Sequence, residues 1–177
     1  MEGATSFESA SLWGVLAVAV LALLYAAHLA RSILAHDKGT PRMQSVAGAI
    51  DRGANAYLRS QFRSLVLLIA VLTIGLYLTA ALAHQPPPIS LARAAAFLMG
   101  SLFSAAVGYL GMNMAVQGSI RVAAAARRSF AEALRLGYRA GTITGMLTDG
   151  LGLLGGTLIF MTYGRMAPEV LLGFGFG

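Results

Sequence analysis

Residues 137–156 have the sequence GYRAGTITGMLTDGLGLLGG, which places a carboxylate on a glycine-rich face of an otherwise apolar segment. Gly137, Gly141, Gly145 and Asp149 follow one another at four-residue spacing, and residues four apart share one face of an α-helix. Small residues let membrane helices approach closely, so this face is predicted to meet a neighbouring helix. A carboxylate inside a membrane segment is costly and typically faces a bundle interior or a wet cavity. The stretch therefore predicts a polytopic membrane protein with Asp149 directed inward.

The composition of the whole chain supports this fold class. Of 177 residues, 57% are hydrophobic and only 11% are charged, whereas soluble domains are about 25% charged. There is no cysteine, which excludes disulfides and thiolate metal sites. The net charge of +6 is interpreted as a topology signal at helix ends rather than as a sign of nucleic-acid binding.

Four apolar segments are long enough to cross a hydrocarbon core of about 30 Å. The sequence therefore predicts an all-α membrane protein with spans at about 12–34, 65–83, 94–117 and 138–163. The connection between the second and third spans contains Pro86, Pro87 and Pro88, which predict an extended conformation there. The third span carries its own small-residue stripe, formed by Ala96, Gly100, Ser104 and Gly108.

The cations predict the orientation of the spans. The connection between spans one and two contains six of the 13 Lys and Arg residues, and the connection between spans three and four contains five. Because cytoplasmic loops carry an excess of Lys and Arg, both long connections are predicted to be cytoplasmic and the N-terminus to lie outside.

The two basic connections are predicted to contain helices. Within residues 43–65, Val46, Ile50 and Tyr57 belong to an approximate apolar stripe, which indicates a helix that either lies at the interface or extends span two. Residues 121–136 are likewise predicted to form a helix that reaches beyond the bilayer. Two roles stay open for these segments: covering a partner domain, or anchoring basic helix ends at lipid headgroups.

After Glu169 the apolar run 170–177 is too short to cross a bilayer as a helix. We expect it to be the start of a fifth span, so that residues 1–177 form the N-terminal part of one larger polytopic membrane domain. A short re-entrant or interfacial tail is the alternative.

The residues themselves assemble no reaction centre. His28, His36 and His84 are predicted to lie at different helix ends, and no two of the seven acidic residues form a close pair of the kind that holds Mg²⁺ with a phosphate. No phosphate-cradling loop is present. No catalytic, cofactor-binding or metal-binding residue is therefore assigned in this chain.

Several motifs nevertheless resemble those of one family. Residues 50–62, IDRGANAYLRSQF, resemble the Q-E-G-A-x-A-Y-L-x-R-Q-Y signature of membrane-integral, ion-pumping pyrophosphatases. The segments GMNMA (111–115) and IRVAAAAR (120–127) are similar to the family's G-M-x-x-A-x-x-A-N-x-R-T-A-x-A-A-R helix. Residues 133–155 resemble its next glycine-rich span, and LGFGFG at 172–177 resembles the start of its fifth helix. The departures are Asp51-Arg52 in place of Gln-Glu, Phe62 in place of Tyr and Ser119 in place of Asn.

The resemblance implies a larger helical pump that works as a homodimer in a prokaryotic plasma membrane or its equivalent. Such a protein hydrolyses Mg²⁺-bound pyrophosphate on the cytoplasmic side and moves H⁺ or Na⁺ outward. Its metal and pyrophosphate ligands begin with the fifth helix, so this chain alone is expected to be inactive. Asp149 is then expected to be a structural or cavity-edge carboxylate rather than the proton carrier. The alternative is a non-enzymatic four-helix membrane module, such as a scaffold or channel subunit.

Overall fold

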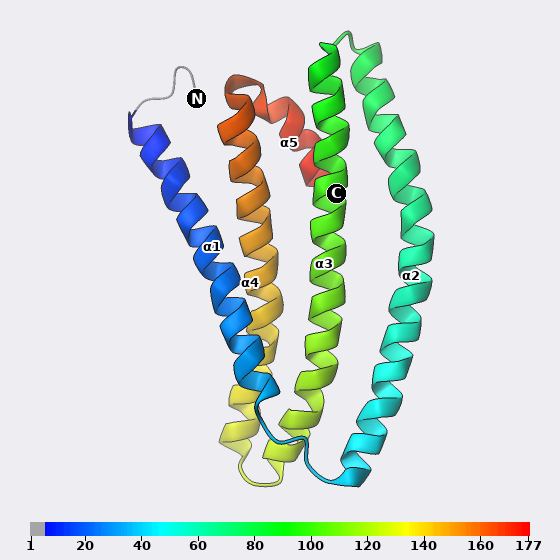
Figure 1. Ribbon diagram of the computed structural model, residues 1–177, viewed down its shortest axis with the longest axis vertical. Helices are drawn as coiled ribbons and strands as arrows, with labels where there is room; N and C mark the ends of the chain where they lie inside the picture. Colours follow the sequence, from blue (N-terminus) through cyan, green and yellow to red (C-terminus); the bar gives the residue numbers. More distant parts are fainter. Residues whose placement is uncertain (1–5) are drawn as a thin grey trace. The chain divides into compact units, whose positions relative to one another are not determined.

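The computed structural model describes residues 6–177, and within them it is all-helical. Four long helices and two short ones follow one another: α1 (Ser6–Leu34), α2 (Pro41–Leu82), α3 (Pro87–Ala126), α4 (Phe130–Tyr163), the 3₁₀-helix η1 (Gly164–Met166) and α5 (Ala167–Phe176) (Figure 1). Four helical segments are long and apolar enough to cross a membrane, which confirms the predicted fold class. The last of these segments comprises α4 together with η1 and α5.

The helix boundaries settle three details of the sequence analysis. Residues 43–65 are part of α2, so this segment extends the second span rather than forming a separate helix. The predicted continuous helix 121–136 is wrong, because α3 ends at Ala126 and α4 begins at Phe130. The predicted extended proline segment is also wrong for two of its three prolines: Pro87 and Pro88 start α3, where the missing N–H of proline costs no helical hydrogen bond.

The chain divides into two compact units, each containing parts of the long helices. The first unit contains the chain up to Leu21, Phe62–Ala106 and Asp149–Gly177. Its buried apolar cluster joins α3, α4 and α5 through Ala92, Ala96, Ile159, Ala167 and Val170. Within this unit α5 turns back from the end of α4 toward α3 (Figure 1).

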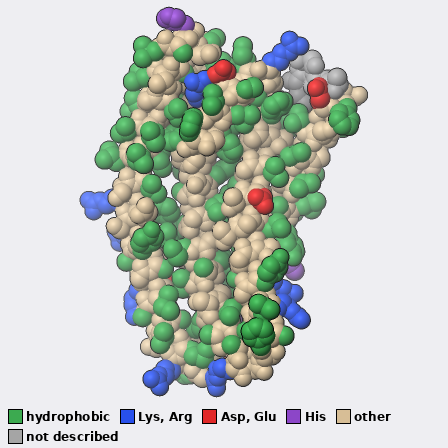
Figure 2. Space-filling view, turned by 180° about the vertical axis from the view of Figure 1, so that it is seen from behind, with side chains coloured by type: hydrophobic (Ala, Val, Ile, Leu, Met, Phe, Trp, Pro, Cys, Tyr) green, Lys and Arg blue, Asp and Glu red, His purple; other side chains and the backbone are tan. Residues whose placement is uncertain are grey.

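The second unit contains Ala22–Gln61 and Val107–Thr148. Its core packs α1, α3 and α4 together through Ala26, Leu29, Ile33, Ala125, Ala133, Leu136 and Ile143. The α1–α2 and α3–α4 connections lie at the same end of this unit (Figure 1). Lys and Arg side chains gather at that end (Figure 2).

Candidate functional site

Arg121 is the most deeply buried charged residue of the second unit, with 2% of its surface exposed. Its Nη1 donates hydrogen bonds to the carbonyl oxygen (2.7 Å) and Oε1 (3.1 Å) of Gln117, one turn earlier on α3. Its Nη2 donates to the carbonyl oxygen of Leu34 at 3.0 Å. Leu34 is the last residue of α1, and the carbonyl groups at a helix C-terminus lack helical partners and attract cations. Arg121 therefore ties the end of α1 to α3.

The sequence alone predicts only a topology role for Arg121, as one of the cations in the connection between spans three and four. One feature of the sequence could have indicated its contact with Gln117. Gln117 lies four residues before Arg121 near the end of an apolar helix, and side chains at that spacing meet on one helical face. The second partner, the Leu34 carbonyl, lies 87 residues away in the chain and depends on the tertiary fold.

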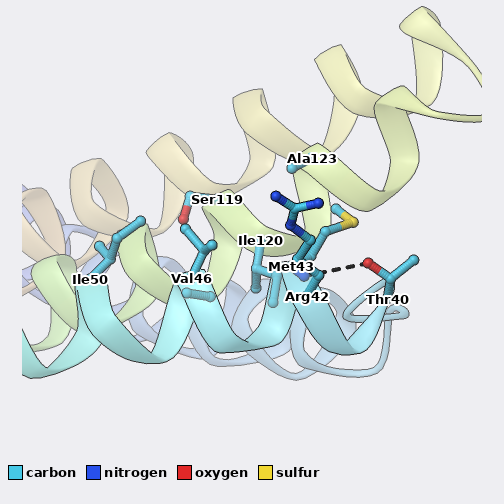
Figure 3. A pocket seen from close by; sticks show the side chains of 9 residues that line it. Thr40, Arg42, Met43, Val46, Ile50, Ser119, Ile120 and Ala123 are labelled. Atoms are coloured by element: carbon cyan, nitrogen blue, oxygen red, sulfur yellow. Dashed lines mark hydrogen bonds between the residues drawn. The ribbon is translucent and has the colours of Figure 1, made fainter.

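An open apolar groove of about 460 Å³ lies beside this tie, between the first turns of α2 and the last turns of α3. Thr40, Met43, Val46 and Ile50 line it from the α2 side, and Ser119, Ile120 and Ala123 line it from α3, with Arg42 as its charged member (Figure 3). Thr40 Oγ1 accepts a hydrogen bond from the Met43 amide at 3.4 Å, which supports the first turn of α2.

The α3–α4 connection carries the second charged cluster of this unit. Arg128 donates to Glu132 at 2.9 Å and lies 3.9 Å from Asp37 of the α1–α2 connection. The hydrogen bond and charge of Glu132, and the weaker charge of Asp37, raise the pKa of Arg128 above its ordinary value. Both contacts are solvent-exposed, so they contribute little stability.

The predicted glycine face of α4 does not pack within the described residues. Gly137, Gly141, Gly145 and Asp149 are all exposed. A methyl group added at Gly141 or Gly145 would meet nothing within 4 Å. The prediction that this stripe meets a neighbouring helix is therefore wrong for the helices of residues 6–177, and the inward direction of Asp149 stays a prediction.

Other glycines make the close contacts. An added methyl at Gly111 would lie 3.1 Å from the side chain of Thr144, and one at Gly118 would lie 3.1 Å from the Ala140 methyl group. The sequence does not predict these two contacts, because helix periodicity shows which glycines share a face but not which face is covered. Of the stripe predicted on α3, Ala96 and Gly100 are buried, whereas Ser104 and Gly108 are exposed.

Mg²⁺ is the metal ion that the family resemblance implies. Within residues 6–177, no three His, Cys, Asp or Glu side chains come together as a metal site would require. Among the described residues Asp149 forms no ion pair, and Glu169 pairs with Arg93. The described residues by themselves therefore do not fit a Mg²⁺ site.

Comparison with known proteins identifies the family. The family model described as inorganic H⁺ pyrophosphatase matches residues 20–177. The chain belongs to the inorganic H⁺ pyrophosphatase family. This result confirms the resemblance inferred from the motifs at residues 50–62 and 111–127.

Curated relatives from this pyrophosphatase family carry one functional description. The "K(+)-insensitive pyrophosphate-energized proton pump" of Chloroflexus aurantiacus is 49% identical, with all of this chain and 25% of the relative aligned. The protein of the same name from Streptomyces avermitilis is 40% identical over 90% of this chain and 21% of its own length. The protein of the same name from Methanosarcina mazei is 36% identical over 89% of this chain and 22% of its own length. The chain thus spans about a quarter of the length of the curated relatives it matches.

Proposed function

We propose that this chain is the N-terminal part of a pyrophosphate-energised proton pump. The observation that carries the proposal is the 49% identity across the whole chain to a relative with that name. The intact protein hydrolyses pyrophosphate on the cytoplasmic side, requires Mg²⁺, and moves H⁺ outward. The names of the relatives favour H⁺ over Na⁺ and activity without K⁺.

Within the pump, residues 6–177 supply a membrane-spanning scaffold rather than the reaction centre. This role is supported by the absence of clustered metal-binding side chains in that range and by the helix-to-helix tie at Arg121. The catalytic residues then lie in the other three-quarters of the pump. The intact protein works as a homodimer in a lipid bilayer. The N-terminus is outside and both basic connections are cytoplasmic.

The experiment is pyrophosphate-driven acidification of inside-out membrane vesicles that contain the complete pump, followed with a pH-sensitive dye. We expect acidification with Mg²⁺ and pyrophosphate in buffers free of Na⁺ and K⁺. A strict requirement for Na⁺, or hydrolysis without acidification, would contradict the proton-pump assignment. Vesicles that contain only this chain serve as the control and are expected to show neither hydrolysis nor acidification.

A non-enzymatic four-helix module is the second candidate. It would be favoured if membranes contained a stable 177-residue product and no longer protein that includes this sequence. Immunoblotting of native membranes with an antibody against the α3–α4 connection distinguishes the two candidates.

A further inference from the structure

The apolar groove between α2 and α3 has different chemistry at its two ends. Arg42 is its charged member, whereas Val46 and Ile50 line it one and two turns later on α2. Figure 3 shows the Arg42 side chain extending from α2 toward α3, near Ala123. Ile50 comes eight residues after Arg42, which is a rise of about 12 Å along the helix. The groove is therefore amphipathic along its length, with a cation at one end and apolar side chains at the other.

The apolar walls of the groove are open within the described residues. Val46 and Ile50 are 58% and 52% exposed, and Ser119 and Ala123 on the opposite wall are exposed as well. The Ser119 hydroxyl donates to the carbonyl oxygen of Val116 at 2.8 Å, so its proton is already used within α3. An occupant that fits these walls must therefore present apolar atoms to them.

Three helices of the second unit place the groove at a membrane surface. α1 ends at Leu34, and its carbonyl oxygen accepts a hydrogen bond from Arg121. The third predicted span ends at about 117, just before Ser119 and the rest of the α3 wall. The fourth begins at about 138, where a methyl group added at Gly137 would lie 3.9 Å from Val122. All three spans therefore end level with the groove.

The direction of the groove is that of a lipid in one leaflet. α2 continues from Ile50 toward its span at 65–83, so Ile50 lies on the bilayer side of the groove and Arg42 lies farther out. A phospholipid has the same order, because its phosphate is outermost and its acyl chains point into the bilayer. The headgroup layer is about 5–8 Å thick, so a groove with a rise of about 12 Å reaches from a phosphate to the acyl chains.

The charge at the outer end of the groove has no anion among residues 6–177. The ion pairs formed in that range involve other cations, and Asp37 of the neighbouring connection lies 3.9 Å from Arg128. Lys38 and Arg127, which are both exposed, belong to the same end of the unit as Arg42. Exposed cations alone do not select a partner. Next to an apolar groove at a membrane surface, however, they are complementary to an amphiphile with an anionic head.

We propose that this groove binds an anionic phospholipid, with the phosphate at Arg42 and an acyl chain along Val46 and Ile50. Anionic lipids attract basic segments near a membrane surface, and the groove adds an apolar contact for the chain. The inference goes beyond the proposed function, because it depends on the membrane fold and not on pyrophosphate hydrolysis. Of the two roles left open for the basic connections, it assigns headgroup anchoring to the connection between α1 and α2.

The test measures lipid binding to the complete protein that contains this chain. Phosphatidylglycerol or phosphatidylcholine is titrated into delipidated protein in detergent, and the apparent dissociation constant is obtained by native mass spectrometry. Arg42→Gln removes the charge, and Ala123→Phe fills the groove from an exposed position without changing the charge. Thermal unfolding of each variant confirms that it is assembled. If Ala123→Phe does not assemble, Val46→Phe fills the groove from the other wall.

Each variant has a matched control outside the groove. Arg52→Gln removes one charge from an exposed arginine on the same helix, and the Arg52 guanidinium lies near Gly48, which does not line the groove. Ala126→Phe adds the same ring at an exposed alanine of α3 that does not line it either. Arg42→Lys keeps the charge and tests whether a cation at this position is sufficient.

We expect Arg42→Gln to raise the dissociation constant for phosphatidylglycerol about fivefold, as one cation near a membrane surface contributes. Ala123→Phe should raise it at least as much, whereas Arg42→Lys, Arg52→Gln and Ala126→Phe should leave it within about twofold. Phosphatidylcholine should bind the unaltered protein more weakly, and Arg42→Gln should not change its binding.

Three results would overturn the proposal. Equal losses in Arg42→Gln and Arg52→Gln would show a general charge effect. Unchanged binding in the groove-filling variant would show that the lipid lies elsewhere, including the case in which another segment of the protein covers the groove. Equal affinity for both lipids would exclude selection of an anionic head. Proton pumping by the unaltered protein is a separate measurement, so either proposal can fail without the other.

Discussion

At the residue scale, individual glycines of this chain have different roles that spacing alone does not distinguish. Gly173 of α5 lies against the backbone of Arg93 on α3, and a methyl group there would clash with the Arg93 carbonyl oxygen. Gly175, two residues later on the same helix, has open space around it. The difference between these neighbours arises from the face of α5 that packs against α3.

We expect Gly173→Ala to lower the free energy of unfolding by about 1–3 kcal/mol, because a backbone carbonyl cannot move aside as a side chain can. Gly175→Ala should instead raise it by about 0.5–1 kcal/mol, since alanine restricts the unfolded chain and favours the helix. Chemical denaturation in detergent micelles, followed by circular dichroism, measures both. Equal effects of the two substitutions would contradict the close packing of α5 on α3.

Arg121 is the second residue with a specific role. Arg121→Gln is expected to lower the free energy of unfolding by about 1.5–3 kcal/mol, because charge-assisted hydrogen bonds to Leu34 and Gln117 are lost. Arg127→Gln, at an exposed neighbouring arginine, is the control and should stay within about 0.5 kcal/mol. The same denaturation experiment compares them, and a comparable loss in both variants would show a general charge effect instead of a tie between α1 and α3.

At the element scale, α3 and α4 approach through Gly118 and Ala140, whereas the predicted glycine face of α4 is open. Gly118→Val should therefore lower the free energy of unfolding of this chain by about 1–3 kcal/mol through overpacking. Gly141→Val has the same change in helix propensity but no neighbour, so its effect should stay within about 0.5 kcal/mol. If Gly141→Val were the more damaging variant in the isolated chain, the face assigned to the α3–α4 contact would be wrong.

The orientation of the helices has its own test, because the chain contains no cysteine. Ala126→Cys at the end of α3 and Ala83→Cys after α2 are matched, exposed alanines at opposite ends of α3. A membrane-impermeant maleimide should label Ala126→Cys only in inside-out vesicles and Ala83→Cys only in right-side-out vesicles. This result follows from the Lys and Arg excess in the two connections predicted to be cytoplasmic, and the reverse pattern would invert the topology.

At the scale of the whole molecule, we expect further helices of the proposed pump to cover the exposed stripe on α4. In the complete pump, Asp149→Asn is expected to lower the yield of assembled protein several-fold, because a change of 1–2 kcal/mol in stability alters abundance by that much. The number of protons moved per pyrophosphate should stay unchanged. Both are measured in the same vesicle preparation, and normal yield with lost pumping would make Asp149 part of the proton path.

The sequence by itself determined the membrane class, the number of long apolar helices and the family. These features depend on local composition, on helix length and on motifs such as residues 50–62, which do not require a folded partner. The continuity of α2 is one of two alternatives that the sequence leaves open, because the apolar stripe around Val46 and Ile50 indicates a helix but not its junction with the span.

The tertiary structure decided which faces of those helices are covered. Gly141 and Gly118 both belong to small-residue patterns, yet only Gly118 has a neighbour, and Arg121 contacts a carbonyl 87 residues away. Periodicity defines the faces of one helix, whereas contacts depend on the rotation and level of a second helix. Those quantities arise from the packing of all helices together, so no window of sequence contains them.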